Sequence, residues 1–317
     1  MNDFSYELMD KARIPCVLCG SGDFDTLCRN DRYWMGIQTA ACRKCGLIMT
    51  NPAPTPAALS DFYKTHYRRL YRRVDRPTPD HIRKYELDRR AAYAAAYMAE
   101  RGLIEARRSV LDVGCAEGSL LKEILRRAPG TAAVGVEPGE GFADFCRAYA
   151  GCEVFPSLEE VKARNRGPFD CVIVIHVLEH VDHPVHFLRG LRDFLTPGGA
   201  IYVDVPDAGA YRSLDDIHLA HLFHFSPRTL AETARQAGFR VADMNRHQPP
   251  RHPASLRCIL RTTGDEGPIP QDPGEDESTR DRIAAFDRTL FSYRLKRSFP
   301  IRLITGALRR LAGLMGR

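Results

Sequence analysis

The sequence lacks long hydrophobic runs, a secretory signal, internal repeats and a strong excess of either charge. Its N-terminus, MNDFSYELMDKARIPC, has no apolar stretch of the kind that signals export. No run of about 18 uncharged apolar residues occurs anywhere, so we expect no membrane-spanning helix and a cytoplasmic location. The net charge of +6 permits contact with a nucleotide, an anionic polymer or a membrane surface, but it selects none of them.

Cysteine is present ten times, and under the reducing conditions of the cytoplasm these residues are expected to be metal ligands or core thiols. Four form two Cys-x-x-Cys pairs: Cys16, Cys19, Cys42 and Cys45. Zn²⁺ prefers four soft ligands in a tetrahedron, and Gly20 and Gly46 follow the pairs where a turn around a metal favours positive φ. We predict a structural zinc without an open coordination position; unrelated core thiols or a redox pair are the alternatives.

From residue 109 to about 263, short apolar runs alternate with amphipathic segments, which is typical of βα units on a parallel sheet. The strands are expected at 109–113, 131–137, 152–155, 169–175, 200–205, 239–247 and 255–262. The helices are expected at 80–101, 118–128, 140–150, 157–165, 184–195 and 227–237. Only seven residues separate the last two strands, too few for a crossover helix, so these strands should be antiparallel. The fold class is α/β, a doubly wound, mostly parallel seven-stranded sheet.

Composition divides the chain into five parts. The parts are a zinc-binding domain (1–50), a Pro-rich joint with a helical substrate-side segment (51–108), the α/β core (109–263), an acidic linker (264–281) and a basic C-terminal helix (282–317). The linker is rich in Pro and Gly and nearly free of large apolar groups, so we expect it to be disordered.

The stretch VLDVGCAEGSLLKEIL has a strand, a Gly-rich turn and a helix in the order that brings backbone N–H groups against a ligand. Gly114 allows the tight turn, and Gly118 permits close approach at the start of the helix. Asp112 would repel a pyrophosphate but suits a ligand with an amino group. Glu137 follows the second strand, where an acid can accept two ribose hydroxyls.

Together with FDCVIVIHVLEHV and LTPGGAIYVDVP, this stretch resembles class I S-adenosylmethionine-dependent methyltransferases, over roughly residues 105–262. The resemblance implies that the cofactor is S-adenosylmethionine, with Ala116 standing where many members have glycine. Ser157 and Glu159 are the nearest candidates for contact with the adenine. The implied cofactor-binding residues are Asp112, Gly114, Cys115, Ala116, Gly118, Glu137, Pro138, His176 and Val177.

A four-cysteine zinc module, a Pro-rich joint and a methyltransferase core also resemble the sugar-modifying methyltransferases, including those that C-methylate nucleotide-linked keto-sugars. Such C-methyltransferases usually carry a further C-terminal domain, whereas only about 55 residues follow the sheet here. We therefore favour O-methylation of a sugar hydroxyl, on a nucleotide-sugar or a glycan, over C-methylation.

Methyl transfer to a hydroxyl needs a proton acceptor, and two His-rich stretches follow the fourth and fifth strands, HVLEHVDHP and DIHLAHLFHFS. His180 is the first candidate for the base, oriented by Glu179 or Asp182, although it also suits packing at a helix start. His221 and His224 are the next candidates. On a helix, His218 and His221 would share a face and His224 would point away, which disfavours a metal motif.

Besides C-methylation, two alternative functions remain open. Arg and Tyr residues in HYRRLYRRVDR (66–76) would suit an RNA base methyltransferase, but the zinc head is only weakly basic, so we favour a small-molecule or glycan substrate over nucleic acid. A non-catalytic cofactor-binding adaptor is disfavoured by the intact cofactor motif.

The tail LKRSFPIRLITGALRRLAGLMGR indicates an amphipathic basic helix, suited either to peripheral contact with an anionic membrane or to docking on protein.

Overall fold

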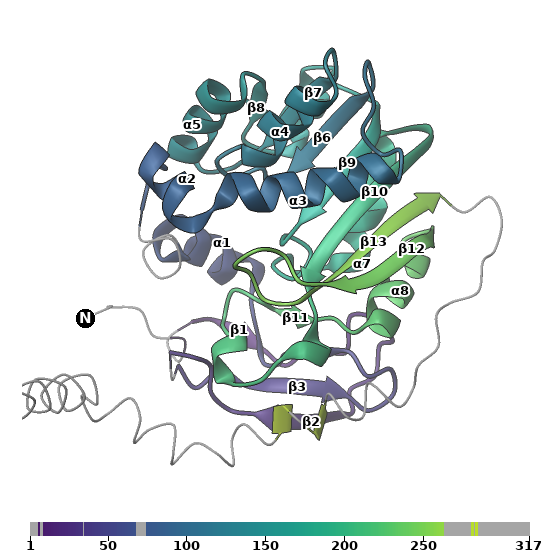
Figure 1. The fold of residues 1–317 in the computed structure, drawn as a ribbon. Helices are drawn as coiled ribbons and strands as arrows, with labels where there is room; N and C mark the ends of the chain where they lie inside the picture. The colour runs from purple at the N-terminus through teal and green to yellow at the C-terminus, as the bar shows by residue number, and fades with distance from the viewer. Residues whose placement is uncertain are drawn as a thin grey trace, which may run out of the picture.

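The computed structural model describes residues 6, 9–33, 35–67, 74–262, 280–281 and 283–284. Its centre is a seven-stranded sheet in the order β12-β13-β10-β9-β6-β7-β8 (Figure 1). The strands are β6 (Ser109–Val113), β7 (Ala132–Val136), β8 (Glu153–Phe155), β9 (Phe169–Ile175), β10 (Leu195–Pro206), β12 (Phe239–His247) and β13 (Ser255–Thr262). The predicted α/β fold class is confirmed, because these seven strands are the seven expected from the sequence.

The direction of the strands also follows the prediction. β8, β7, β6, β9 and β10 run parallel, whereas β13 pairs antiparallel with both β10 and β12. The connection between β12 and β13 is too short for a crossover, so the chain turns back directly as a hairpin. The carboxyl ends of β6, β7, β9 and β10 consequently meet at one edge of the sheet, where ligands bind in open α/β folds.

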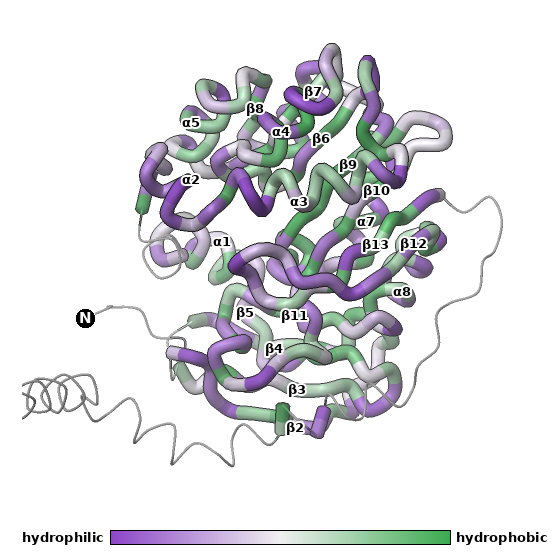
Figure 2. Tube along the Cα trace, in the orientation of Figure 1, coloured by the Kyte–Doolittle hydropathy of each residue, from purple (hydrophilic) through white to green (hydrophobic). Residues whose placement is uncertain are grey.

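Helices cover both faces of the sheet, as a doubly wound fold requires. On one face α3 (Leu87–Glu100), α4 (Ser119–Arg127) and α5 (Glu140–Ala150) bury apolar side chains against the strands. On the other face α6 (Leu158–Ala163), α7 (Pro184–Gly190) and α8 (Pro227–Gln236) do the same. Figure 2 shows the hydrophobic colouring of the central strands between these layers.

The prediction of a single helix over 80–101 is wrong. Two helices, α2 (Pro79–Tyr85) and α3, meet at Glu86, whose φ of 51° and ψ of 42° lie in the left-handed region. The Glu86 carboxylate binds Arg89 at 2.9 Å and Arg251 at 3.0 Å. Arg251 lies in the β12–β13 hairpin, so this ion pair is a tertiary contact at the break that helical propensity does not reveal.

The cysteine-rich head forms two small sheets below the core in Figure 1. β1 (Lys11–Ala12) pairs with β5 (Ala53–Pro54), and β2 (Phe24–Cys28), β3 (Thr39–Cys42) and β4 (Ile48–Thr50) form an antiparallel sheet. A fourth strand of that sheet, β11 (Phe223–His224), comes from the loop after β10 and pairs with β4. The head and one face of the core share a continuous hydrophobic cluster, and α1 (Pro56–Thr65) leads from the head towards the core.

Two expectations fall largely outside the described residues. The predicted linker (264–281) is described only at 280–281 and the predicted C-terminal helix (282–317) only at 283–284. Among the residues that the structure describes, no helix is long and apolar enough to cross a membrane.

Candidate functional site

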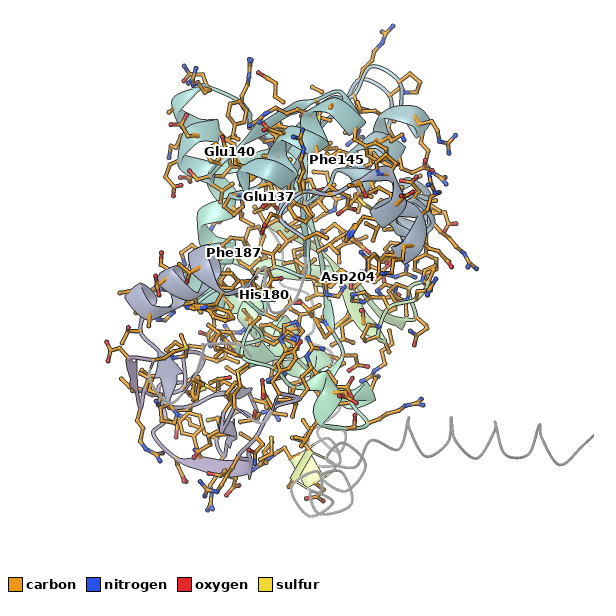
Figure 3. All side chains as sticks on the ribbon, turned by 90° about the vertical axis from the view of Figure 1, so that its left-hand side faces the viewer. Glu137, Glu140, Phe145, His180, Phe187 and Asp204 are labelled. Carbon is orange, nitrogen blue, oxygen red and sulfur yellow. The ribbon has the colours of Figure 1, made fainter. Side chains whose placement is uncertain are left out.

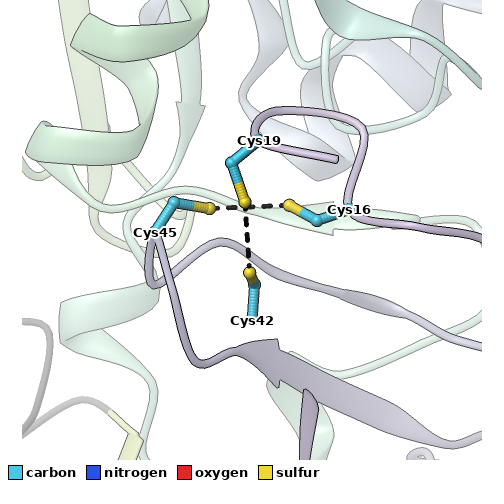
Figure 4. A group of neighbouring side chains, drawn as sticks. All are labelled: Cys16, Cys19, Cys42 and Cys45. Carbon is cyan, nitrogen blue, oxygen red and sulfur yellow. Dashed lines mark hydrogen bonds between the residues drawn. The ribbon is translucent and has the colours of Figure 1, made fainter. Parts of the chain in front are cut away.

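The four cysteines expected to bind zinc come together in the head. Their Sγ atoms all lie within 4.8 Å of one another, with 3.5 Å between Cys16 and Cys45 and 3.4 Å between Cys19 and Cys42 (Figure 4). Four sulfurs bound to one zinc at about 2.3 Å stand about 3.8 Å apart in a tetrahedron. The cluster therefore fits a closed tetrathiolate zinc site.

The backbone around the two cysteine pairs is nearly the same. Gly20 N–H donates to the Cys16 carbonyl at 2.8 Å, and Gly46 N–H donates to the Cys42 carbonyl at 2.9 Å. Gly20 and Gly46 have φ of 71° and 79°, which confirms the positive φ predicted for both. Two such turns facing each other are typical of a structural metal site, and four thiolates leave no open position for catalysis.

The Gly-rich loop after β6 is shaped by close contacts. Gly114 has φ of 80°, and a Cβ there would lie 2.6 Å from Val177 Cγ2. Gly118 has φ of 84°, and a Cβ there would lie 2.4 Å from Cys146 Sγ. Ala116 also has a positive φ, 47°. Only small residues therefore allow this loop to approach both its neighbours and a ligand.

Acidic side chains gather beside this loop. Asp112 on β6 is buried, and burial raises its pKa to about 7, with the Glu117 and Glu137 carboxylates adding to the effect. Glu137 follows β7 and accepts a hydrogen bond from Gly139 N–H at 2.7 Å. An acidic lining disfavours phosphate and suits a ligand with cationic groups, such as a sulfonium and an ammonium.

Three cavities meet at His176, which lines all of them. The largest, about 650 Å³, lies between the Gly-rich loop, Glu137 and α1. A second of about 180 Å³ reaches Asp112 and α3, and a third of about 310 Å³ lies towards the head. In Figure 3 Glu137, His180 and Asp204 lie in the middle of the molecule, where these cavities are found.

Most residues expected to bind the cofactor line the first two cavities. These are Asp112, Gly114, Cys115, Ala116, Glu137, Pro138, His176 and Val177. Gly118 lines neither and begins α4 behind the loop. Ser157 caps α6 and does not line the largest cavity, nor does Glu159, whereas Phe142 on α5 does. Phe142 is therefore better placed than Ser157 or Glu159 to contact an adenine ring.

His180 lies at the boundary between the first and third cavities. Its Nδ1 lies 2.7 Å from the Ala220 carbonyl oxygen and 3.0 Å from the Tyr63 hydroxyl. Its Nε2 lies 3.8 Å from Oε1 of Glu179, which is fully buried, whereas Asp182 is exposed. Because a carbonyl only accepts, Nδ1 carries the proton and Nε2 keeps the basic lone pair.

The second His-rich stretch is not the helix considered above. His218 and His221 have ring centroids 3.7 Å apart, and His221 Nε2 lies 3.8 Å from Glu179 Oε1. Burial keeps the pKa of His221 well below its usual value, and lowers that of His224 to about 4. His224 is on β11, with Nδ1 3.0 Å from the Tyr211 hydroxyl, and lines none of the three cavities. His180 and His221 remain the better placed candidates.

Several cavity residues had no role in the sequence analysis. His247 Nε2 lies 3.0 Å from Asp204 Oδ2, and the His252 ring lies 4.3 Å from that of His176. Both histidines come from the β12–β13 hairpin, and Tyr63 comes from α1. No local motif marks them, because pairing of distant strands and docking of α1 bring them to the site.

The fold and the site define a class I S-adenosylmethionine-dependent methyltransferase. A family model described as "Methyltransferase domain" matches residues 80–243, more than half of the chain, so the chain belongs to this family. A ubiquinone biosynthesis O-methyltransferase of Acinetobacter baylyi is 26% identical over 158 residues, covering 43% of this chain and 65% of that protein. One from Xanthomonas axonopodis pv. citri is 29% identical over 153 residues, covering 43% and 64%. The chain thus spans slightly less than two thirds of the length of these curated relatives.

A solved structure supports the fold. The 1,6-didemethyltoxoflavin-N1-methyltransferase of Burkholderia thailandensis, bound to 1,6-didemethyltoxoflavin and S-adenosylhomocysteine, aligns with a TM-score of 0.50 and 18% identity. The alignment covers 70% of this chain and 98% of that one. At this identity the likeness shows the fold alone, and the acceptor must be argued from the site.

Proposed function

We propose that this enzyme transfers a methyl group from S-adenosylmethionine to a hydroxyl oxygen of a small molecule, and that the acceptor is a sugar on a nucleotide or a glycan. The observation that carries the proposal is the meeting of a cofactor-sized cavity with a polar cavity at His176 and His180. The cofactor supplies an activated methyl group with its own leaving group. The protein therefore has to align the acceptor and remove its proton.

The largest cavity suits the nucleoside part of the cofactor. Glu137 offers a carboxylate at the end of β7, where it can accept hydrogen bonds from two ribose hydroxyls. Phe142 offers an aromatic face in the same cavity. Asp112 and the Gly114 loop border the 180 Å³ cavity, where the carboxylate suits the amino group of the methionine part.

The 310 Å³ cavity suits an acceptor with several hydroxyls. Its lining is rich in hydrogen-bonding side chains, namely Arg32, Tyr211, Asp215, Asp216, His218 and His221. An apolar acceptor would take hydrating water from these groups without replacing its hydrogen bonds, which costs free energy. A sugar can form those bonds, and this contrast supports a glycan or nucleotide-sugar acceptor.

His180 is the proposed acceptor of the hydroxyl proton. Its Nδ1–H points to the Ala220 carbonyl, so Nε2 is the basic nitrogen at the cavity boundary. The Tyr63 hydroxyl contacts the same ring and, at 3.3 Å, the same carbonyl, which limits rotation of the imidazole. A fixed tautomer with an accessible lone pair is what general base catalysis needs.

A phenolic hydroxyl is the second candidate acceptor. The curated relatives carry the name ubiquinone biosynthesis O-methyltransferase, and their match covers 43% of this chain. The shared part is less than half of this chain, so the name of these relatives does not by itself assign the acceptor. The polar lining leads us to prefer the sugar.

The test is transfer of labelled methyl from S-adenosylmethionine to two panels, one of nucleotide-sugars and one of catechols and polyprenyl phenols. We expect labelling in the first panel, with the methyl on oxygen by mass spectrometry and NMR. Labelling confined to phenols would replace the sugar by the second candidate, and a methyl on carbon would contradict O-methylation. A Glu137→Ala variant, tested in parallel, controls for label that does not depend on the cofactor site.

A further inference from the structure

Glu179 has a fully buried carboxylate that faces three histidines. Its Oε1 lies 3.2 Å from His176 Nδ1, 3.8 Å from His180 Nε2 and 3.8 Å from His221 Nε2. Its Oε2 is buried without a hydrogen-bond partner in the described part of the chain. A buried carboxylate with an unpaired oxygen is costly unless a positive group compensates it.

The donor set has the spacing of a metal site. One carboxylate oxygen of Glu179 and one ring nitrogen each of His180 and His221 lie within 4.8 Å of one another. Ligands about 2.1 Å from a common cation stand roughly 3.0–3.4 Å apart in octahedral or tetrahedral geometry. The 3.8 Å separations from the carboxylate therefore close onto one ion with small side-chain rotations.

The orientation of the His180 and His221 rings also suits metal binding through Nε2. A metal-binding histidine usually donates its other ring N–H to a carbonyl or carboxylate, which aims its lone pair at the metal. His180 does this through Nδ1 to the Ala220 carbonyl at 2.7 Å, leaving Nε2 towards Glu179. His221 also turns Nε2 towards Glu179, and its Nδ1 is buried without a hydrogen-bond partner among the described residues.

We propose that Glu179, His180 and His221 bind a divalent transition-metal ion, separate from the tetrathiolate zinc. Two imidazoles and one carboxylate suit Zn²⁺, Co²⁺, Fe²⁺ or Mn²⁺ rather than Ca²⁺. Three protein ligands leave coordination positions open, and His180 and His221 both line the 310 Å³ cavity, so the ion is placed to bind acceptor oxygens.

This proposal rests on the proposed function for the identity of the acceptor atom, and it changes the role of His180. An ion in this position lowers the pKa of a bound hydroxyl, so the proton can leave to water. The oxygen lone pair then forms the bond to the methyl carbon while the carbon–sulfur bond breaks, and S-adenosylhomocysteine leaves. In the metal-loaded enzyme His180 is a ligand and no longer removes the proton itself.

The test measures binding of Co²⁺ to full-length protein whose cysteine site is already filled with zinc. We expect one additional Co²⁺ per chain, with ligand-field absorption but no thiolate-to-cobalt charge-transfer band. Glu179→Gln and His221→Gln should each weaken this binding at least tenfold, because each removes a direct ligand. His186→Gln, which changes an exposed histidine on α7, should bind Co²⁺ like the unchanged protein.

Two results would overturn the proposal: no Co²⁺ bound beyond the zinc-loaded site, or equal Co²⁺ affinity in the His186→Gln and His221→Gln variants. Melting temperature and S-adenosylmethionine affinity show whether each variant is folded, and the use of two ligand variants guards against misfolding of one. Since the measurement needs neither acceptor nor methyl transfer, its failure leaves the proposed function standing. If neither the nucleotide-sugars nor the phenols are methylated, the measurement of metal binding likewise remains valid.

Discussion

His180 Nδ1 lies 2.7 Å from the carbonyl oxygen of Ala220, and this contact joins the two His-rich loops of the site. The loop after β9 carries His180, and the loop after β10 carries Ala220 together with His221. The latter loop continues into β11, which pairs with β4 of the cysteine-rich head. The position of the proposed catalytic histidines thus depends on both the core and the head.

Replacing His180 by Ala should lower the turnover number by roughly 10²–10⁴-fold, the range for loss of a group that activates the acceptor proton. The affinity for S-adenosylmethionine should stay nearly unchanged, because the ring acts on the acceptor. Turnover is measured with saturating cofactor, and affinity by calorimetry. His186→Ala is the matched control, since this exposed ring on α7 stacks only on His183, 4.5 Å away, among the described ring contacts. A decrease in turnover of less than tenfold in His180→Ala would contradict a role of His180 in the reaction.

Replacing Glu137 by Ala should weaken S-adenosylmethionine binding by about 1.5–3 kcal/mol, because a charged acceptor for two hydroxyls is lost. That corresponds to roughly 10–150-fold in Kd. Glu140→Ala is the control, since Glu140 is an exposed acid in the first turn of α5, three residues away. Calorimetric affinities that are equal in the two variants would contradict the placement of the ribose at Glu137.

Asp112 should make cofactor binding depend on pH. With a pKa of about 7 in the free protein, its carboxyl is protonated below pH 7 and must lose that proton to pair with an amino group. The affinity for S-adenosylmethionine should therefore rise by up to tenfold per pH unit as the pH approaches 7 from below, and level off above it. Asp112→Asn should remove this dependence; calorimetry across the range measures both proteins, and parallel pH curves would contradict the assignment.

The same pKa gives a stability effect of opposite sign. The folded protein holds the Asp112 proton more tightly than the unfolded chain, so this group's contribution to stability falls as the pH rises from about 4 to about 7. Across that window the loss is on the order of 4 kcal/mol for a fully buried group. Without cofactor, Asp112→Asn should gain stability relative to the unchanged protein as pH rises, as measured by denaturant unfolding at several pH values.

Replacing Cys42 by Ser should abolish tight zinc binding, because one of four thiolates is lost. Cys28→Ser is the control: Cys28 is buried in the same head, outside the cluster, and its thiol donates to the Asn30 carbonyl, a bond that serine can retain. We expect one zinc per chain in the control and much less in Cys42→Ser by elemental analysis. Full metal content in Cys42→Ser would contradict the site.

Loss of that zinc should also reduce methyl transfer, although the metal has no open position for catalysis. Met49 on β4 pairs with Phe223 on β11, and Thr50 N–H donates to the Leu222 carbonyl at 2.8 Å, next to His221. A disordered head would release this loop. Turnover should fall while S-adenosylmethionine affinity, which depends on the core, is preserved.

These links explain what the sequence could and could not predict. Most of the seven strands were predictable because they are short apolar runs bounded by turn residues, and the cofactor loop was predictable because Gly114 and Glu137 belong to a local pattern. The pairing of β11 with β4 joins segments about 175 residues apart and leaves no local pattern. The break at Glu86 and the entry of His247 into the site have the same origin, since both depend on the β12–β13 hairpin.

The end of the predicted linker and the start of the C-terminal segment contact the head and the loop after β10. Arg280 binds Asp25 at 2.7 Å, and Ile283 is fully buried in a cluster with Leu27 and Tyr211. Beyond Ala284 the prediction rests on sequence: residues 295–317 contain six Lys or Arg and no acid, and apolar residues recur at helical spacing. A chain ending at Ala284 therefore removes the basic segment but keeps the attachment.

Co-sedimentation with vesicles tests one of the two roles considered for this segment, peripheral contact with an anionic membrane, against docking on protein. Full-length protein should co-sediment with vesicles that contain phosphatidylserine, since each basic residue near such a surface contributes about 1 kcal/mol, and binding should weaken as salt is added. The chain ending at Ala284 should remain in the supernatant, and neither protein should pellet with vesicles of neutral lipid. Replacing Arg309 and Arg310 by Gln should reduce pelleting while retaining the apolar spacing. Equal sedimentation of the full-length and shortened chains would contradict membrane contact through this segment.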